Sequence, residues 1–136
     1  METLPLWFGR LTVTAFFAIA FGQSAADKLL DSRGNLSFLS GHFANSPLRN
    51  LVPGMFWTIT ALEAAAGVLC GLGALQTLLG AGTSLGLLGL ILATLSLLSL
   101  FFGQRLAKDY PGAAVLAGYY AVALLGLLLF GLKATT

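Results

Sequence analysis

The sequence predicts an all-α integral membrane protein: a four-helix bundle with a short interfacial helix between the first two membrane spans. Of its 136 residues, 57% are hydrophobic and only 9% are charged, whereas about a quarter of the residues of a soluble domain are charged. Mean hydropathy is +0.90, and four apolar stretches each approach the ~20 residues that cross a bilayer. This composition excludes an ordinary soluble enzyme, a disordered chain and a nucleic-acid-binding domain, and the length predicts one transmembrane domain over residues 1–136.

Polar or helix-breaking residues bound each predicted span. Pro5 suits the first turn of a helix, although the apolar run that ends in Ser24-Ala25-Ala26 also fits a cleavable signal peptide. We expect this segment to be retained as a span, because Glu2 and apolar residues stand where a signal peptide carries basic ones. Pro111 interrupts the helix between the last two spans. The spans are expected at residues 5–26, 52–75, 80–103 and 112–132.

The longest connection, residues 27–51, carries apolar side chains among polar ones. Their spacings of three, four and seven predict a short helix lying in the membrane interface; they are Leu36, Phe38, Leu39 and Phe43. Asn45 or Ser46 is predicted to cap the start of the next helix. The segment is either a lid that shields the end of the bundle, which is the simpler interpretation, or a cover over a site between the helices.

The cations are distributed unevenly over the two ends of the bundle. The end with both termini holds Arg10 and Lys133, whereas the opposite end holds Lys28, Arg33, Arg49, Arg105 and Lys108. The positive-inside rule then places both termini outside the cytoplasm. We predict that a reporter active only in the cytoplasm stays silent when it is fused after Thr136; strong activity would reverse the orientation.

Small residues indicate which spans pack closely. Gly67 and Gly71 form a GxxxG pattern in the second span, and Gly82 and Gly86 form another in the third. Such residues let helix backbones approach in lipid, where no hydrophobic force drives helices together. Spans two and three are therefore expected to form a tight hairpin.

Arg10 and Glu63 are the ionisable residues at depth in the first two spans. A charge in the bilayer core costs about 2.5–3.5 kcal/mol on insertion scales, so such residues are expected to be paired or functional. Both side chains are long enough for a direct or water-bridged contact. We predict a shared buried polar site, either a structural ion pair or a site for a ligand headgroup or a proton.

A second group of side chains is expected near the end formed by the first and third loops. Adjacent helical residues point about 100° apart, so one of Tyr119 and Tyr120 should face the bundle. Aromatic residues at this depth either anchor the protein at the interface or line a slot for a quinone or a similar flat amphiphile. The candidate pocket residues are Gln23, His42, Trp57, Gln104, Tyr119 and Tyr120.

No motif indicates an intrinsic redox or metal centre. Cys70 is the only cysteine and His42 the only histidine, which excludes a dithiol relay and bis-histidine haem ligation. No metal-ligand cluster, P-loop or dinucleotide motif occurs. We therefore assign no catalytic residue and no metal ligand, and expect no cofactor beyond a bound quinone or lipid.

Several motifs resemble those of the DoxX family of small four-helix membrane proteins. They are Arg10, Lys28-Leu29, Glu63 followed by Gly67, Gly71 and Gly73, FANSPL at 43–48 and GQRLAKDYPGAA at 103–114. Ala25 departs from the family pattern, which often has a glycine three residues before the lysine. The resemblance implies a bundle that accompanies membrane oxidoreductases, as in the small subunit of a thiosulfate:quinone oxidoreductase, and a place in the bacterial inner (cytoplasmic) membrane.

The sequence thus favours a non-catalytic accessory or quinone-adjacent subunit of a membrane oxidoreductase complex. Its expected partners are the lipid bilayer and other membrane protein subunits, with no nucleic acid. The alternatives are a small transporter that uses Glu63 as a protonatable site, and a self-associating structural membrane protein. A guanidinium partner for Glu63 argues against the transporter, because it would hold the carboxylate ionised.

Overall fold

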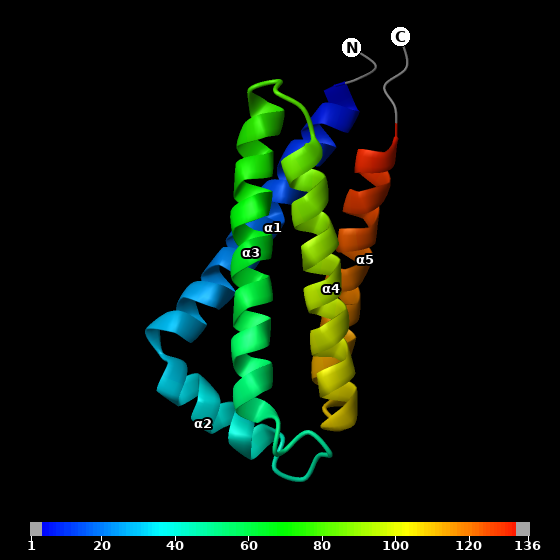
Figure 1. Ribbon diagram of the computed structural model, residues 1–136. Coiled ribbons are helices and arrows are strands. Elements are labelled where there is room, and N and C mark those ends of the chain that lie inside the picture. Colours follow the sequence, from blue (N-terminus) through cyan, green and yellow to red (C-terminus); the bar gives the residue numbers. More distant parts are fainter. Residues whose placement is uncertain (1–3, 133–136) are drawn as a thin grey trace.

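The computed structural model describes residues 4–132, which form four long helices and one short helix (Figure 1). Each long helix is long and apolar enough to cross a membrane, and exposes large apolar side chains on its outer face. The predicted all-α membrane bundle is confirmed. The helices are α1 (Leu4–Leu30), α2 (Ser32–His42), α3 (Val52–Leu78), α4 (Ser84–Leu106) and α5 (Tyr110–Gly131).

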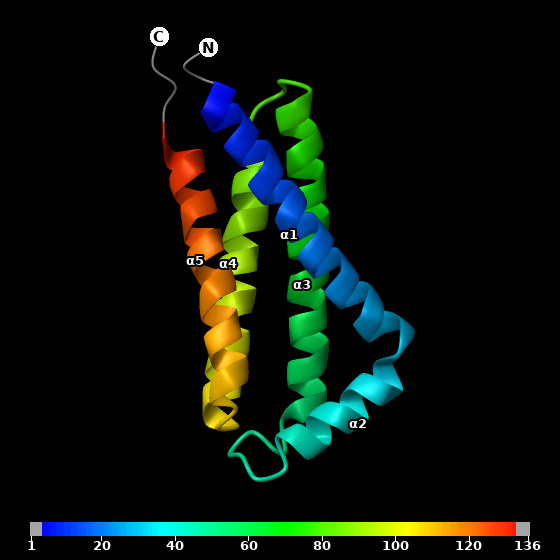
Figure 2. The same cartoon turned by 180° about the vertical axis from the view of Figure 1, so that it is seen from behind.

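The helices run up and down, and α1 crosses α3 obliquely (Figures 1 and 2). The start of α1, the α3–α4 turn and the end of α5 lie at one end of the bundle, which we call the termini end. The short helix α2, the start of α3 and the α4–α5 turn lie at the other, the α2 end. The core between them is built from side chains such as Phe17, Phe21, Leu90 and Leu97.

The first helix runs further than the sequence suggested, and α2 follows it almost directly. No break occurs until Asp31, whose carboxylate accepts a hydrogen bond from the backbone N–H of Gly34 at 3.2 Å and so caps α2. The short helix therefore starts at Ser32, before the apolar residues that predicted it. It contains no fully buried residue.

The predicted cap of the following helix was wrong. Helix α3 begins at Val52 after Leu51, without a side-chain cap and with a proline in its first turn. Ser46 instead stabilises a turn, because its hydroxyl accepts a hydrogen bond from the backbone N–H of Leu48 at 2.9 Å. Asn45 is exposed. A proline after Ser46 is compatible with such a turn as well as with a helix start.

The α3–α4 hairpin is tight at the termini end, as the glycines predicted. A Cβ on Gly73 would lie 2.4 Å from the backbone of Gly86, and one on Gly89 would lie 2.7 Å from the backbone nitrogen of Cys70. The GxxxG pattern of α3 does not contact α4 as expected, however. Gly67 faces α1 instead, because a Cβ added to Gly67 would lie 2.8 Å from the backbone nitrogen of Gly22.

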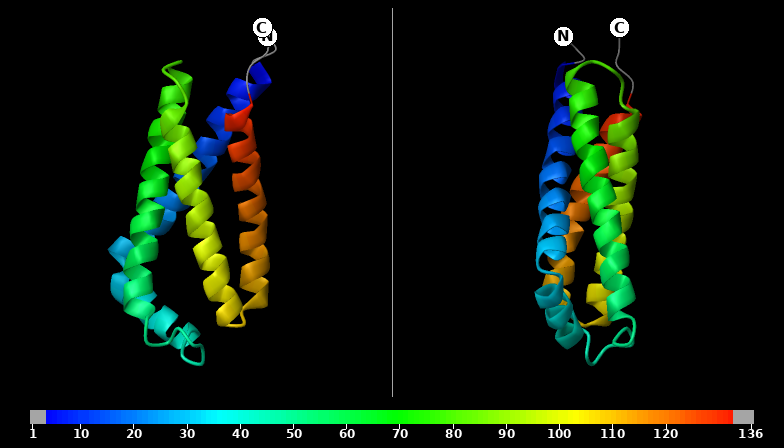
Figure 3. Two further views of the ribbon diagram at one scale, coloured as in Figure 1. Left: turned by 45° about the vertical axis from the view of Figure 1, so that its right-hand side comes forward. Right: turned by 60° about the vertical axis from the view of Figure 1, so that its left-hand side comes forward.

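Helices α3 and α4 diverge from this tight contact toward the α2 end (Figure 3, left). Gly80 and Gly82 form the turn with φ values of +70° and +111°, so α4 starts only at Ser84 rather than near residue 80. At the opposite end, the wedge between the two helices is covered by α2 and by Phe43, which is 8% exposed. The fold therefore places a space between α3 and α4 at the α2 end.

Candidate functional site

A cavity of about 270 Å³ occupies the wide end of the α3–α4 wedge. Helix α2 lies on one side of it, so the connection between the first two spans covers a cavity between the helices. Most of the lining is apolar, and the polar contributors are Lys28, Asn35, Ser99 and Gln104. The apolar wall comes from Phe38, Leu39, Phe43, Val52, Met55, Phe56, Ile59 and Leu100.

The cavity continues into a shallow groove along α3 and α4. Cavity and groove share Met55, Ile59, Ser99 and Gly103. The groove has a volume of about 460 Å³, and its other walls are mostly apolar and include the exposed Leu51 and Phe102. An elongated molecule could therefore hold one end in the cavity and lay the other along the groove.

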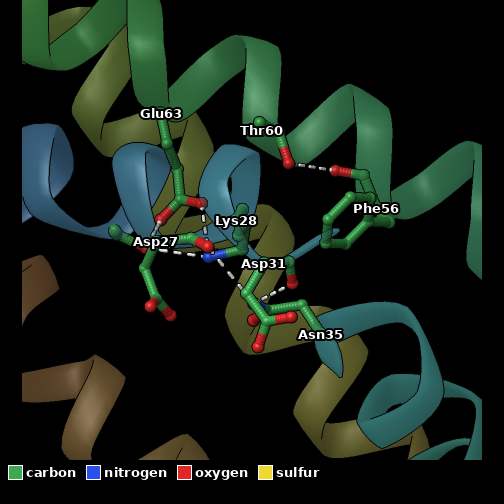
Figure 4. A network of polar contacts seen from close by, with 8 residues as sticks. Asp27, Lys28, Asp31, Asn35, Phe56, Thr60 and Glu63 are labelled. Atoms are coloured by element: carbon green, nitrogen blue, oxygen red, sulfur yellow. Dashed lines mark hydrogen bonds and ion pairs between the residues drawn. The ribbon is translucent and has the colours of Figure 1, made fainter. Parts of the chain in front are cut away.

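A buried ion pair lies where α1 crosses α3 (Figure 4). The Lys28 ammonium lies 2.8 Å from Glu63 Oε1 and donates a hydrogen bond to Ser24 Oγ, also at 2.8 Å. The Ser24 hydroxyl donates in turn to Glu63 Oε2 at 2.7 Å. The contact between Lys28 and Oε1 is an ion pair without hydrogen-bond alignment. We call Ser24, Lys28 and Glu63 the polar triad.

Helix geometry explains why these three residues meet. Ser24 and Lys28 are four residues apart and lie on one face of α1, while Glu63 lies on α3 one turn before Gly67, which contacts α1 closely. The Glu63 side chain is 3% exposed and that of Lys28 is 17% exposed. The triad thus neutralises a deeply buried carboxylate, and its lysine also lines the cavity.

Arg10 is not the partner of Glu63, so the predicted shared site was wrong. Its Nε donates to the Leu129 carbonyl at 3.0 Å and its Nη2 to the Leu132 carbonyl, and the guanidinium lies 5.6 Å from the Phe130 ring centroid. It therefore satisfies free carbonyls at the C-terminus of α5, where a cation is favourable. Ser24 lies 14 residues further along α1, about 21 Å at the helical rise.

This separation predicts additive effects of changes at the two positions. Arg10→Gln should loosen the end of α5, and Glu63→Gln should disturb the polar triad, without influence of one on the other. In unfolding measurements on detergent-solubilised protein, the double variant should match the sum of the single losses within about 0.5 kcal/mol. A coupling well above that value would mean that the two residues interact after all.

His42 and Gln104 of the predicted pocket lie together at the end of α2. His42 Nε2 is 2.8 Å from Gln104 Oε1 and 3.4 Å from Asp109 Oδ2, and the Phe38 ring stacks on the imidazole at 5.6 Å. Asp109 was not predicted; it caps α5 by accepting a hydrogen bond from the Gly112 N–H at 3.0 Å. The cluster fastens the end of α2 to the α4–α5 turn, beside the cavity.

Of the six predicted pocket residues, Gln104 lines the cavity, whereas His42 lies beside it and the other four do not line it. Tyr120 packs against the core, whereas Tyr119 is 40% exposed and lies against Phe16 with 6.1 Å between ring centroids, so one tyrosine faces the bundle as expected. Trp57 is 48% exposed, and Gln23 is also exposed. These two side chains point outward, where aromatic and amide groups suit a membrane interface.

Lys28 and Ser24 are the triad residues that the sequence analysis did not predict, and Lys28 is the charged one. It was counted as a loop cation because the first span was expected to end at residue 26, whereas α1 continues to Leu30. No residue between Ala26 and Leu30 is a helix-stop signal. The first helix could therefore have been extended past Lys28 from the sequence. Within residues 4–132, no group of three His, Cys, Asp or Glu side chains could hold a metal ion.

No protein-family model matches the chain, and comparisons with curated proteins and with solved structures found no match.

Proposed function

We propose that the protein is a DoxX-like, non-catalytic accessory subunit of a membrane oxidoreductase complex, and that it binds a quinone or a similar amphiphile. The cavity at the α2 end carries this proposal. Its volume is close to the lower limit of small-molecule sites, about 300 Å³, and such sites are mostly apolar with a few polar groups. A flat headgroup would occupy the cavity, and an apolar tail would follow the groove into the lipid.

The partner subunits are proposed from the sequence resemblance and from the small size of the chain. The proposed setting is the bacterial inner membrane, with both termini away from the cytoplasm. In that orientation, the α2 end and its cavity face the cytoplasmic leaflet.

Purification from native membranes in mild detergent tests the proposal. We expect quinone or another amphiphile, and further membrane subunits, to co-purify with the wild-type protein. Ser99→Trp should strongly reduce the bound amphiphile, because Ser99 lines both cavity and groove. Leu98→Trp is the matched control, since Leu98 is 51% exposed on the same helix and lines neither. Equal amphiphile content in the two variants, or none in the wild type, would contradict the proposal.

The transporter remains a second candidate because of the buried carboxylate. The partner of Glu63 is an ammonium, which can give up a proton, whereas a guanidinium in effect cannot. Arg10, which bonds carbonyls at the end of α5, therefore gives no reason to reject a transporter. Proton-driven uptake of a substrate into vesicles that contain the purified protein, lost in Glu63→Gln, would favour this candidate over the accessory subunit.

A further inference from the structure

We propose that Lys28 is the headgroup-binding residue of the cavity, and that it selects an uncharged carbonyl headgroup over an anionic one. This inference rests on the proposed function, because it specifies which group binds the amphiphile. Lys28 belongs both to the polar triad and to the residues that line the cavity.

The hydrogen-bonding capacity of Lys28 leaves at least one donor for a ligand. An ammonium has three N–H groups and accepts no hydrogen bond. Among the described residues, Ser24 Oγ and Glu63 Oε1 lie 2.8 Å from Nζ, one as hydrogen-bond acceptor and one as ion-pair partner. The remaining N–H can donate to an acceptor in the cavity, and a carbonyl oxygen is such an acceptor.

The charge balance of the site determines the kind of headgroup. Lys28 is the only charged residue among those that line the cavity, and Glu63 already neutralises it. An anionic headgroup would bring a second negative charge next to a paired ammonium, with the carboxylates of Asp27 and Asp31 on the same stretch of chain. A neutral carbonyl gains the hydrogen bond without this repulsion.

The triad also holds the ammonium in place. Lysine side chains are flexible, and near a helix end they extend toward water. Here Glu63 and Ser24 hold Nζ from two sides, and Ser24 is itself fixed by its hydrogen bond to Glu63 Oε2. Ser24 and Glu63 are therefore positioning residues, and Lys28 is the member of the triad that would touch the ligand.

Binding to protein in lipid nanodiscs tests this inference. Three probes have alkyl chains of nearly equal length: a decyl-substituted 1,4-benzoquinone, decylbenzene without carbonyls, and decanoate, a nonyl chain with an anionic carboxylate headgroup. Equilibrium dialysis measures binding in excess of empty nanodiscs. The wild type should bind the quinone about ten- to hundredfold more tightly than decylbenzene, the worth of one hydrogen bond to a charged donor, and also more tightly than decanoate.

The variant for this test removes the whole charge pair. The double variant Lys28→Met with Glu63→Leu keeps the site neutral, so it avoids the unpaired charge that would threaten the folding of either single variant. It should bind decylbenzene like the wild type and lose the preference for the quinone. Leu98→Trp, at an exposed position that does not line the cavity, should keep both properties.

The outcomes separate the inference from the proposed function. If the double variant keeps the preference for the quinone, or if decanoate binds the wild type most tightly, the role of Lys28 is overturned while the cavity remains an amphiphile site. If no probe binds the wild type above empty nanodiscs, the proposed function fails, and the inference fails with it.

Discussion

Replacing Lys28 by Met is expected to be among the most damaging single substitutions in the protein. Among the described residues, it leaves the Glu63 carboxylate, 3% exposed, with the Ser24 hydroxyl as its one hydrogen-bond partner. Breaking a buried ion pair by removing one partner typically costs about 3–5 kcal/mol. We expect a loss of this size in the free energy of unfolding, measured by denaturant titration of detergent-solubilised protein.

Glu63→Leu should lower the free energy of unfolding by less than Lys28→Met does, because the unpaired Lys28 ammonium that it leaves can move. Lys28 lies two residues from the end of α1, so its ammonium can extend toward the interface at the α2 end. The double variant should regain much of the stability lost in Lys28→Met. A double-mutant cycle should give a coupling above about 1 kcal/mol; additive losses within about 0.5 kcal/mol would contradict a stabilising pair.

The helices of this fold could be predicted because each depends on a local property of the chain. A stretch of about 20 apolar residues has few alternatives to a spanning helix, and all four such stretches form one. The helix ends were harder. Asp31 and Asp109 act as caps because each accepts a hydrogen bond from the free backbone N–H three residues later, whereas Ser46, which looks like a cap, stabilises a turn.

The pairing of charges could not be predicted from depth alone. Arg10 and Glu63 were predicted to form a pair because each was taken as the buried charge of its span. That prediction ignores where two tilted helices cross. Helix α1 contacts α3 most closely near Gly22 and Gly67, and the residues around that crossing, Ser24 and Lys28, become the partners of Glu63. Close glycine contacts therefore identify the partner better than a count of residues along each span.

The cavity follows from the packing of α3 against α4, and sequence reasoning found it only in part. His42 and Gln104 were placed at the right end, because loop positions fix which end they occupy. The rotation of each helix about its own axis decides whether a side chain faces inward. The sequence did not provide this rotation for the helices that carry Trp57 and the two tyrosines. The cavity itself exists because glycines bring the helices together at one end only, so that they separate at the other.

That packing makes Gly73→Ala the second substitution with a large expected effect. The added Cβ would lie 2.4 Å from the Cα and nitrogen of Gly86, and backbone atoms cannot move aside as a flexible side chain does. The two helices must separate, which also disturbs the neighbouring contact between Gly89 and Cys70. Overpacking of this kind costs about 1–3 kcal/mol, occasionally more, and the gain in helix propensity from glycine to alanine, at most about 1 kcal/mol, offsets only part of it.

Gly71→Ala is the matched control for this prediction, because it makes the same change two residues earlier in α3. Its Cβ would meet only the Ala18 Cβ at 3.8 Å, an ordinary van der Waals contact. We expect this variant to unfold at the same denaturant concentration as the wild type or at a higher one, while Gly73→Ala unfolds at a clearly lower one. Equal midpoints for the two variants would show that the α3–α4 contact is not tight at Gly73, and would remove the reason for the wedge that opens into the cavity.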